Sequence, residues 1–434
     1  MSELEFTDNE AEPQKERDES ITLGLPEPWP HSAVETEAIV AGAMSLRIRA
    51  ALKGDVATIA PGQLIEVGEA VLSAGASIAD MGMILRKLGI TTYLMARAGD
   101  DPFGRLLLRM VNEQDPALSS GIVITQGQNT SYTLLLEADA ARKERIAIHS
   151  PGYSDSLTTD DIRHDLLSRV GLFHFSVPYS MVSLSEDAPL IPVLERVKAD
   201  NITISLAFSL LEAQRNAGKT DWRAFLSRAL PFVDIVLLDV EDLLFMLRRP
   251  LFDKLSHKAG QRALLDIVPP DVVSELGHQL LDLGAKIVGL RAGHRGFYLC
   301  TAAGDALEQL GRAQPVRFIS WSDRELWAPC FVSNVERAMK ADGAAIAGFL
   351  MGMLRGMSPE ETISAACAVD ACGSEAEDTL SAIPNWPAII ERVAAGWPRF
   401  LPEGKKKSPL DMAEAGWRWS ERYELWVGPQ DTHY

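Results

Sequence analysis

The chain has 434 residues, of which 47% are hydrophobic and 24% are charged, an ordinary balance for a globular protein. This composition excludes wholesale disorder, and the counts of 32 Gly, 24 Pro and 4 Cys exclude a collagen-like chain and a disulfide scaffold. The formal net charge of −18 repels phosphate backbones, so we expect no nucleic-acid partner.

The N-terminal residues 1–34 are predicted to form a disordered acidic tail, because residues 1–30 hold nine acidic and two basic residues and few apolar ones. This segment lacks the basic start and apolar run of a signal peptide. No apolar stretch approaches the ~18 residues that a membrane-spanning helix needs. We therefore expect a cytoplasmic protein with no membrane partner.

The first ordered element is predicted near residue 35, where a continuous apolar run indicates a buried strand over 37–43. Further along, the pattern predicts a strand over 65–72, a helix over 80–88, a strand over 91–96 and a helix over 101–112. Two β-like runs, 131–137 and 144–150, flank a polar turn and predict a hairpin.

Beyond the hairpin, strands and helices alternate. Strands are predicted over 172–176, 202–206, 235–238, 286–291 and 297–301, and helices over 190–199, 222–230, 241–247, 273–283, 344–354, 359–372 and 386–395. The segment 249–271 contains three prolines and is expected to be an inserted loop. The alternation predicts an α/β fold with a mainly parallel sheet and helices on both faces.

Several segments, in this order, resemble the signatures of the PfkB, or ribokinase-like, carbohydrate kinases. They are Gly75–Gly89, Arg97–Gly104, Thr130–Leu135, Arg145–Gly152, Val233–Asp242, Leu283–Gly293 and Ala341–Arg355. The resemblance implies a doubly wound, mainly parallel sheet and a small β lid. The kinase domain would cover 35–400, with the lid from about 51–65 and 131–150, and 401–434 would be a C-terminal extension. It also implies ATP and Mg²⁺ as cofactors, a sugar or nucleoside ligand, and a lid that allows a homodimer.

The family transfers the γ-phosphoryl group of ATP to a hydroxyl, using a Gly-Ala-Gly-Asp turn whose Asp is the general base. The amides of the turn and the following helix dipole neutralise the phosphate. The resemblance places Lys340, Ala341, Asp342 and Gly343 on this turn. The base position then holds Gly343, which cannot accept a proton, and Asp342 would serve as base only if the loop shifts by one residue. Alternatively, Asp342 is the N-cap of the helix.

The substrate side departs from the family pattern as well. Arg47 stands where the family holds sugar hydroxyls with an aspartate, and an arginine side chain donates only. Gly75, Ala76 and Asp80 stand where the first signature has a glycine pair and an asparagine. Asp80 could accept hydrogen bonds from sugar hydroxyls or pair with Arg47.

On the nucleotide side, Asp239 and Asp242 replace the family's Asn-x-x-Glu. These carboxylates could hold Mg²⁺ through water, or they could be only the acidic start of a helix. Arg291, Gly293 and Gly296 form the strand end and glycine turn that the resemblance places near the nucleotide.

The combined changes favour a kinase-fold protein with weakened or lost phosphoryl transfer, a pseudokinase-like binding or regulatory protein. One alternative is an active sugar or nucleoside kinase that uses Asp342 as a shifted base. Another is a scaffold that uses the acidic tail and the aromatic segment 417–426, although such a segment more often packs on its own domain.

Overall fold

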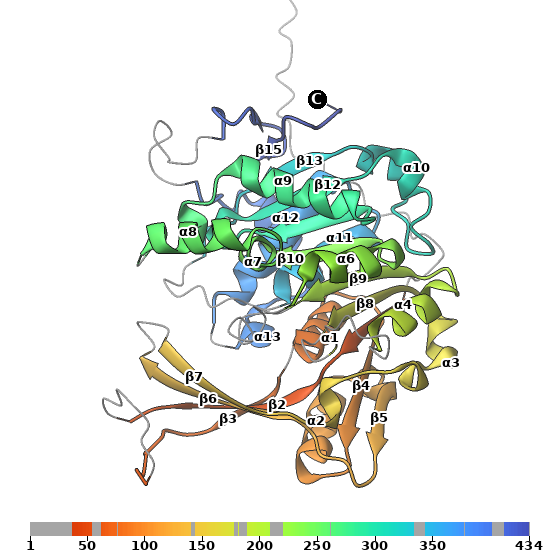
Figure 1. Cartoon of the computed structure of the whole chain (residues 1–434), viewed down its shortest axis with the longest axis vertical. Helices are drawn as coiled ribbons and strands as arrows, with labels where there is room; N and C mark the ends of the chain where they lie inside the picture. Colours follow the sequence, from red (N-terminus) through yellow and green to blue (C-terminus); the bar gives the residue numbers. More distant parts are fainter. Residues whose placement is uncertain are drawn as a thin grey trace, which may run out of the picture.

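The computed structural model describes residues 37–53, 62–75, 77–139, 144–177, 181, 189–208, 220–260, 262–333, 343–376, 378–401 and 412–433 (Figure 1). These residues form a large sheet of 11 strands and a small sheet of four. The large sheet has the order β14 (Arg418–Ser420), β15 (Leu425–Val427), β13 (Glu325–Ala328), β12 (Phe297–Thr301), β11 (Ile287–Arg291), β10 (Ile235–Asp239), β9 (Thr203–Phe208), β8 (Val170–Val177), β1 (Glu37–Gly42), β4 (Thr92–Gly99) and β5 (Gly121–Thr125).

The strands from β11 to β5 are parallel, and the remaining strands add to one edge in antiparallel fashion. In β1, Ala38 and Val40 pack into the core on one face, and Ile39 and Ala41 pack into the core on the other. Burial on both faces explains why this strand is a continuous apolar run rather than an alternating one. The predicted α/β fold with a mainly parallel sheet is therefore confirmed.

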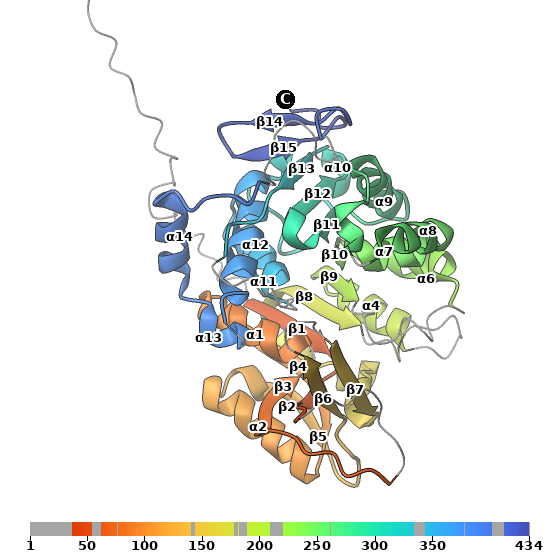
Figure 2. The same ribbon diagram turned by 90° about the vertical axis from the view of Figure 1, so that its left-hand side faces the viewer.

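Helices cover both faces of the large sheet, as Figure 2 shows. One face is covered by α1 (Ser77–Lys87), α2 (Pro102–Gln114), α11 (Ala344–Leu354) and α12 (Pro359–Gly373), and the other by α4 (Leu190–Lys198), α6 (Trp222–Ala229), α7 (Val240–Leu247) and α9 (Pro270–Asp282). The remaining helices are α3 (His164–Leu167), α8 (Arg249–Ala259), α10 (Gly304–Leu307), α13 (Thr379–Ala382) and α14 (Trp386–Ala394). No helix in the described ranges is both long and apolar enough to cross a membrane.

The expected loop over 249–271 is wrong, because the helix α8 occupies its first half. Leu255 and Ala259 are buried one helical turn apart, which supplies the apolar face that the helix needs. Pro250 lies in the first turn, where the missing N–H would have no helical partner in any case. A proline at the start of a helix was thus mistaken for a loop signal.

The small sheet has the order β3 (Val71–Gly75), β2 (Ser45–Ala51), β6 (Tyr132–Asp139) and β7 (Glu144–Ser150). The predicted hairpin is confirmed, since β6 and β7 pair in antiparallel fashion. The strand expected over 65–72 begins instead at Val71, and Val67 forms only an isolated bridge with Leu52. Figure 1 shows this sheet projecting from the large sheet beside β1 and α2. Residues 54–61 of the expected lid lie outside the described residues.

The C-terminal aromatic segment packs against the chain's own large sheet. The strand β15 pairs with β13, and the buried Trp417 makes edge-to-face contacts with Tyr298 and Trp327. Aromatic pairs of this geometry add to the burial of apolar area. This arrangement agrees with the expectation that the segment covers its own domain.

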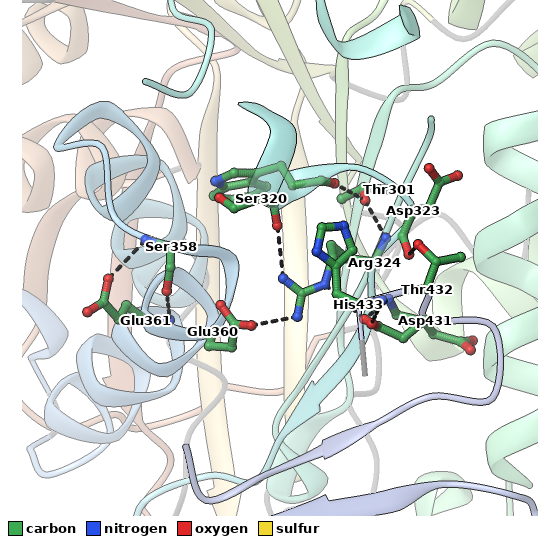
Figure 3. Close-up of polar contacts among 12 residues, drawn as sticks. Thr301, Ser320, Asp323, Arg324, Ser358, Glu360, Glu361, Asp431, Thr432 and His433 are labelled. Atoms are coloured by element: carbon green, nitrogen blue, oxygen red, sulfur yellow. Dashed lines mark hydrogen bonds and ion pairs between the residues drawn. The ribbon is translucent and has the colours of Figure 1, made fainter. Parts of the chain in front are cut away.

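A buried ion-pair network fixes the end of the chain (Figure 3). The Arg324 side chain is only 3% exposed and donates to the carboxylates of Asp431 at 2.9 Å and Glu360 at 2.5 Å. Its third contact is the carbonyl of Ser320 at 2.9 Å. Because Glu360 lies in the first turn of α12 and Arg324 directly precedes β13, the network joins the terminal segment to both elements.

Replacement of Asp431 by Ala should therefore lower the free energy of unfolding by about 3 kcal/mol, since it leaves a buried guanidinium short of one counter-charge. Urea unfolding measures this change. The matched control is Glu113→Ala, which removes a surface partner of Arg109 that is 59% exposed and should change stability by less than about 0.5 kcal/mol. Equal effects of the two variants would contradict the structural role of the network.

His174 in β8 gives a second prediction, on the pH dependence of stability. Burial lowers the pKa of this fully buried imidazole to about 3, and its Nδ1 lies 3.0 Å from the hydroxyl of Ser205. Between about pH 6.5 and 3 the unfolded chain binds a proton that the folded chain refuses, so stability should fall as the pH falls through this window. The loss should be on the order of a few kcal/mol.

The measurement is urea unfolding at a series of pH values for the wild type and His174→Asn. The variant should show a flatter acid dependence, whereas His257→Asn, at an exposed position of α8, should keep the wild-type slope. An unchanged slope in His174→Asn would show that other groups dominate acid unfolding.

Candidate functional site

The topology of the large sheet singles out the carboxyl ends of β1 and β8. The chain adds β4 and β5 on one side of β1 and later adds β8 to β11 on the other side. In open parallel sheets, ligands bind in the crevice at such a switch in strand order. Gly42 ends β1 here, and a Cβ at this position would lie 2.3 Å from the carbonyl oxygen of Ser176 in β8. Only glycine permits this close approach at the switch point.

The N-terminus of α11 lies at the same edge of the sheet. The strand β13 is antiparallel to β12, which is antiparallel to β11, so β13 ends at the carboxyl edge and the chain then leads to α11. A helix N-terminus carries partial positive charge and favours an anion. Gly343, the one residue of the predicted anion site that the structure describes, therefore lies on the side of the sheet where the topology predicts a ligand.

The described part of the helix start carries no carboxylate. Gly343 is the N-cap of α11, its φ is 95°, no side chain caps the helix, and no acidic residue lies in the first turn. The alternative in which Asp342 is the N-cap is therefore wrong by one residue. Lys340, Ala341 and Asp342 themselves lie outside the described residues, so the geometry of the turn stays a prediction.

Arg47 lies on a polar row that crosses the small sheet. It is in register with Ser73 of β3 and Thr133 of β6, and Thr133 is in register with His149 of β7, so the four side chains share one face. We call these four residues the polar face. Arg47 is partly buried and has no hydrogen-bond or ion-pair partner within the described ranges. The conjectured pair with Asp80 is therefore not formed.

The other residues of the first signature lie at the start of α1. Asp80 is partly buried in the first turn of this helix and makes contacts of its own. Gly75 ends β3, and Ala76 lies outside the described residues. The assignment of Gly75, Ala76 and Asp80 to substrate binding stays a prediction.

Two predicted residues on the nucleotide side do meet. Arg291 donates to the Asp239 carboxylate at 2.7 Å, because the two residues are in register at the ends of β11 and β10. Asp242 is 2% exposed in the first turn of α7 and has partners of its own. No cluster of three or more potential metal ligands is found among the described residues. An Asp239 carboxylate engaged by arginine is a weaker candidate for Mg²⁺ than a free one.

The glycine turn that follows β11 is held from several sides. Gly293 and Gly296 have φ values of 54° and 98°, and a Cβ on Gly296 would lie 1.9 Å from the carbonyl oxygen of Ala328. Between them, Arg295 donates to the carbonyl of Val268 at 2.7 Å, and burial lowers its pKa to about 10. The Cys330 thiol donates to the carbonyl of Gly293 at 3.2 Å. The turn is therefore rigid and requires glycine.

The sequence did not reveal the hydrogen-bonded chain beside Arg47. The Nδ1 of His149 lies 2.9 Å from the Thr133 hydroxyl, and its Nε2 lies 3.2 Å from the Asp155 carboxylate. Burial alone would raise the pKa of Asp155, but hydrogen bonds from His149, Ser131 and the Gly152 amide outweigh it and lower the pKa. The hairpin sequence carries no clear signal for this face, because Thr133 is followed by three consecutive leucines in β6 rather than by alternating polar residues.

Solved structures share the overall fold. Ribokinase from Thermotoga maritima matches with a TM-score of 0.59 and 16% identity, over 82% of this chain and 99% of that one. A fructokinase with bound ATP from Xylella fastidiosa matches with a TM-score of 0.59 and 17% identity, over 82% and 98%. A nucleoside kinase from Methanocaldococcus jannaschii, described as a member of the ribokinase family, matches with a TM-score of 0.57 and 15% identity, over 83% and 99%.

Sequence comparison gives a shorter match. Fructokinase-1 of Zea mays and Fructokinase-1 of Oryza sativa subsp. japonica are each 27% identical over 121 residues. The matched segment spans 28% of this chain and 37% of each plant protein. No protein-family model matches the sequence. The chain therefore has the ribokinase-like fold, as its motifs indicated, and the fold is that of a group of carbohydrate kinases.

The glycine turn allows a direct test of the local geometry. Gly296→Ala should lower the free energy of unfolding by about 2 kcal/mol or more, because the new Cβ meets the backbone of Ala328. Gly260→Ala is the control: it also has a positive φ, 62°, but no atom within 4 Å of the new Cβ, so it should cost about 1 kcal/mol. Urea unfolding of both variants measures the difference. If Gly296→Ala costs no more than the control, the turn is not held as described.

Proposed function

We propose that this chain is a ribokinase-fold protein that binds a sugar or nucleoside ligand and has weak or no ATP-dependent phosphoryl transfer. The observation that carries the proposal is that Gly343 is the N-cap of α11. The motif resemblance assigns this residue to the position of the family's general base. A glycine cannot accept the hydroxyl proton, and loss of a general base lowers a rate by about 10²–10⁴.

The backbone at this position supports the same conclusion. A φ of 95° lies in a region that L-residues rarely adopt, so the site is built for glycine rather than for a displaced aspartate. On the nucleotide side, the pairing of Asp239 with Arg291 at 2.7 Å leaves that carboxylate less available to a metal ion. ATP and Mg²⁺ are expected as cofactors only under the alternative, in which the chain is an active kinase.

The alternative is an active sugar or nucleoside kinase in which Asp342 reaches the base position. Asp342 directly precedes Gly343 in the sequence, and this alternative requires the loop to shift by one residue so that the Asp342 carboxylate takes the base position. A scaffold role for the segment 417–426 is less favoured, since Trp417 is already buried against Tyr298 and Trp327 of its own chain.

The decisive measurement is phosphoryl transfer from γ-labelled Mg²⁺–ATP to a pool of sugars and nucleosides. We expect no transfer by the wild type above the level without protein, and none by Gly343→Asp, because aspartate is strained at a φ of 95°. Ligand binding is followed in parallel by thermal unfolding, which should show stabilisation by at least one member of the pool.

Two further variants make the assay specific. Asp342→Ala removes the candidate shifted base, and Asp165→Ala removes an exposed carboxylate that precedes β8 at the opposite edge of the sheet. Transfer by the wild type that disappears in Asp342→Ala and persists in Asp165→Ala would establish the active alternative and refute our proposal.

A further inference from the structure

We propose that the polar face of the small sheet binds the anionic group of a small polyhydroxylated ligand, a sugar that carries a carboxylate or a phosphate, through the guanidinium of Arg47. The inference rests on the proposed function, because it specifies the class of ligand for the same site. Its starting point is a partly buried cation without a counter-charge in the part of the chain that the structure describes.

Arg49 provides the contrast within the same strand. It lies on the same face of β2 as Arg47, and its Nε is 3.9 Å from the carboxylate of Glu137. The residues in register with Arg47 are Ser73 and Thr133, which bring hydroxyl groups and no charge.

An acidic group that contacts this face, Asp155, is already engaged. The Asp155 carboxylate accepts from the Gly152 amide at 3.0 Å and lies 3.2 Å from Nε2 of His149. These contacts hold the pKa of Asp155 low, so the carboxylate is charged; it pairs with His149, and no contact between it and Arg47 is found among the described residues. The guanidinium therefore keeps its donors for a group from outside the described chain.

The polar face adjoins the switch point of the large sheet. Met44, which joins β1 to β2, donates its amide to the carbonyl of Ser154 at 3.2 Å, and Leu46 donates to the carbonyl of Ser131 at 3.0 Å. Ser154 directly precedes Asp155. On the opposite face of β2, Leu46 and Ile48 pack into the core. Arg47 thus lies on the face of β2 that is not used for packing, next to the carboxyl end of β1.

The side chains of the polar face are suited to bind an anion that also carries hydroxyl groups. A guanidinium is a planar fork of donors that matches the two oxygens of a carboxylate or phosphate. The Ser73 hydroxyl, and the Thr133 hydroxyl beside its contact with His149, can donate to and accept from ligand hydroxyls. A neutral sugar would leave the Arg47 charge uncompensated, whereas an anionic sugar neutralises it.

The test compares three probes by isothermal titration calorimetry: D-gluconate, D-fructose 6-phosphate and D-fructose. At least one anionic probe should bind the wild type about 10–100-fold more tightly than fructose, and the two anions distinguish a carboxylate from a phosphate. Arg47→Gln should abolish this preference. Arg49→Gln, the matched control on the same strand, should keep it.

Three results would overturn the inference. They are binding of fructose as tight as that of both anions, no binding of either anion at millimolar concentration, and an equal loss of anion preference in both variants. The unliganded proteins give an independent readout. Arg47→Gln should raise the unfolding temperature, since it removes an uncompensated charge, and a lower unfolding temperature would also contradict the inference.

The transfer assay separates this inference from the proposed function. Transfer to an anionic sugar that depends on Asp342 would refute the proposed loss of activity and leave the ligand class standing. Binding of a neutral sugar without transfer, and without an effect of Arg47→Gln, would refute the ligand class and leave the loss of activity standing.

Discussion

The close packing of α11 against α12 is the constraint on which the candidate site depends. Nearly all of α11 is buried, so it needs a partner on every side. A Cβ on Gly348 would lie 2.8 Å from the carbonyl oxygen of Ala365, and a Cβ on Gly352 would lie 3.1 Å from the Cα of Thr362. The two glycines therefore let the helix backbones touch. Arg324 ties the first turn of α12 to the start of β13. Since α11 packs against α12, this tie also fixes where α11 begins, after its N-cap Gly343.

The elements that could be predicted from the sequence are those whose signal is local. The apolar run of β1 and the helical spacing of α1 require no knowledge of a partner, and both elements form where the pattern placed them, within a few residues. The short strands β13, β14 and β15 were missed, because they exist only through pairing with distant segments. In α8, a proline that starts a helix resembled one that ends it.

The features of the candidate site also divide into those that are local in the sequence and those that depend on the fold. The absence of a carboxylate at Gly343 and the presence of a cation at Arg47 could be read from motif spacing, since each concerns one position. The ion pair of Asp239 with Arg291 joins residues 52 positions apart, and it became visible only when β10 and β11 were placed in register. The contact of His149 with Thr133 depends on strand pairing in the same way. The type of residue at a position can be read from the sequence, whereas the side chains that it contacts are set by the fold.

The two altered positions carry different physical meanings, and together they favour binding over catalysis. Under the proposed function, Gly343 lacks a group that only a reaction needs, and its positive φ suits the backbone without any ligand. Arg47 has the opposite character, because a partly buried guanidinium that finds no counter-charge among the described residues destabilises a fold that gains nothing else from it. Simple decay of a kinase would explain Gly343 but not a residue with such a cost. Under the proposed function, a ligand that supplies the missing negative charge explains Arg47, and the fold keeps a binding role although it lacks the reacting group.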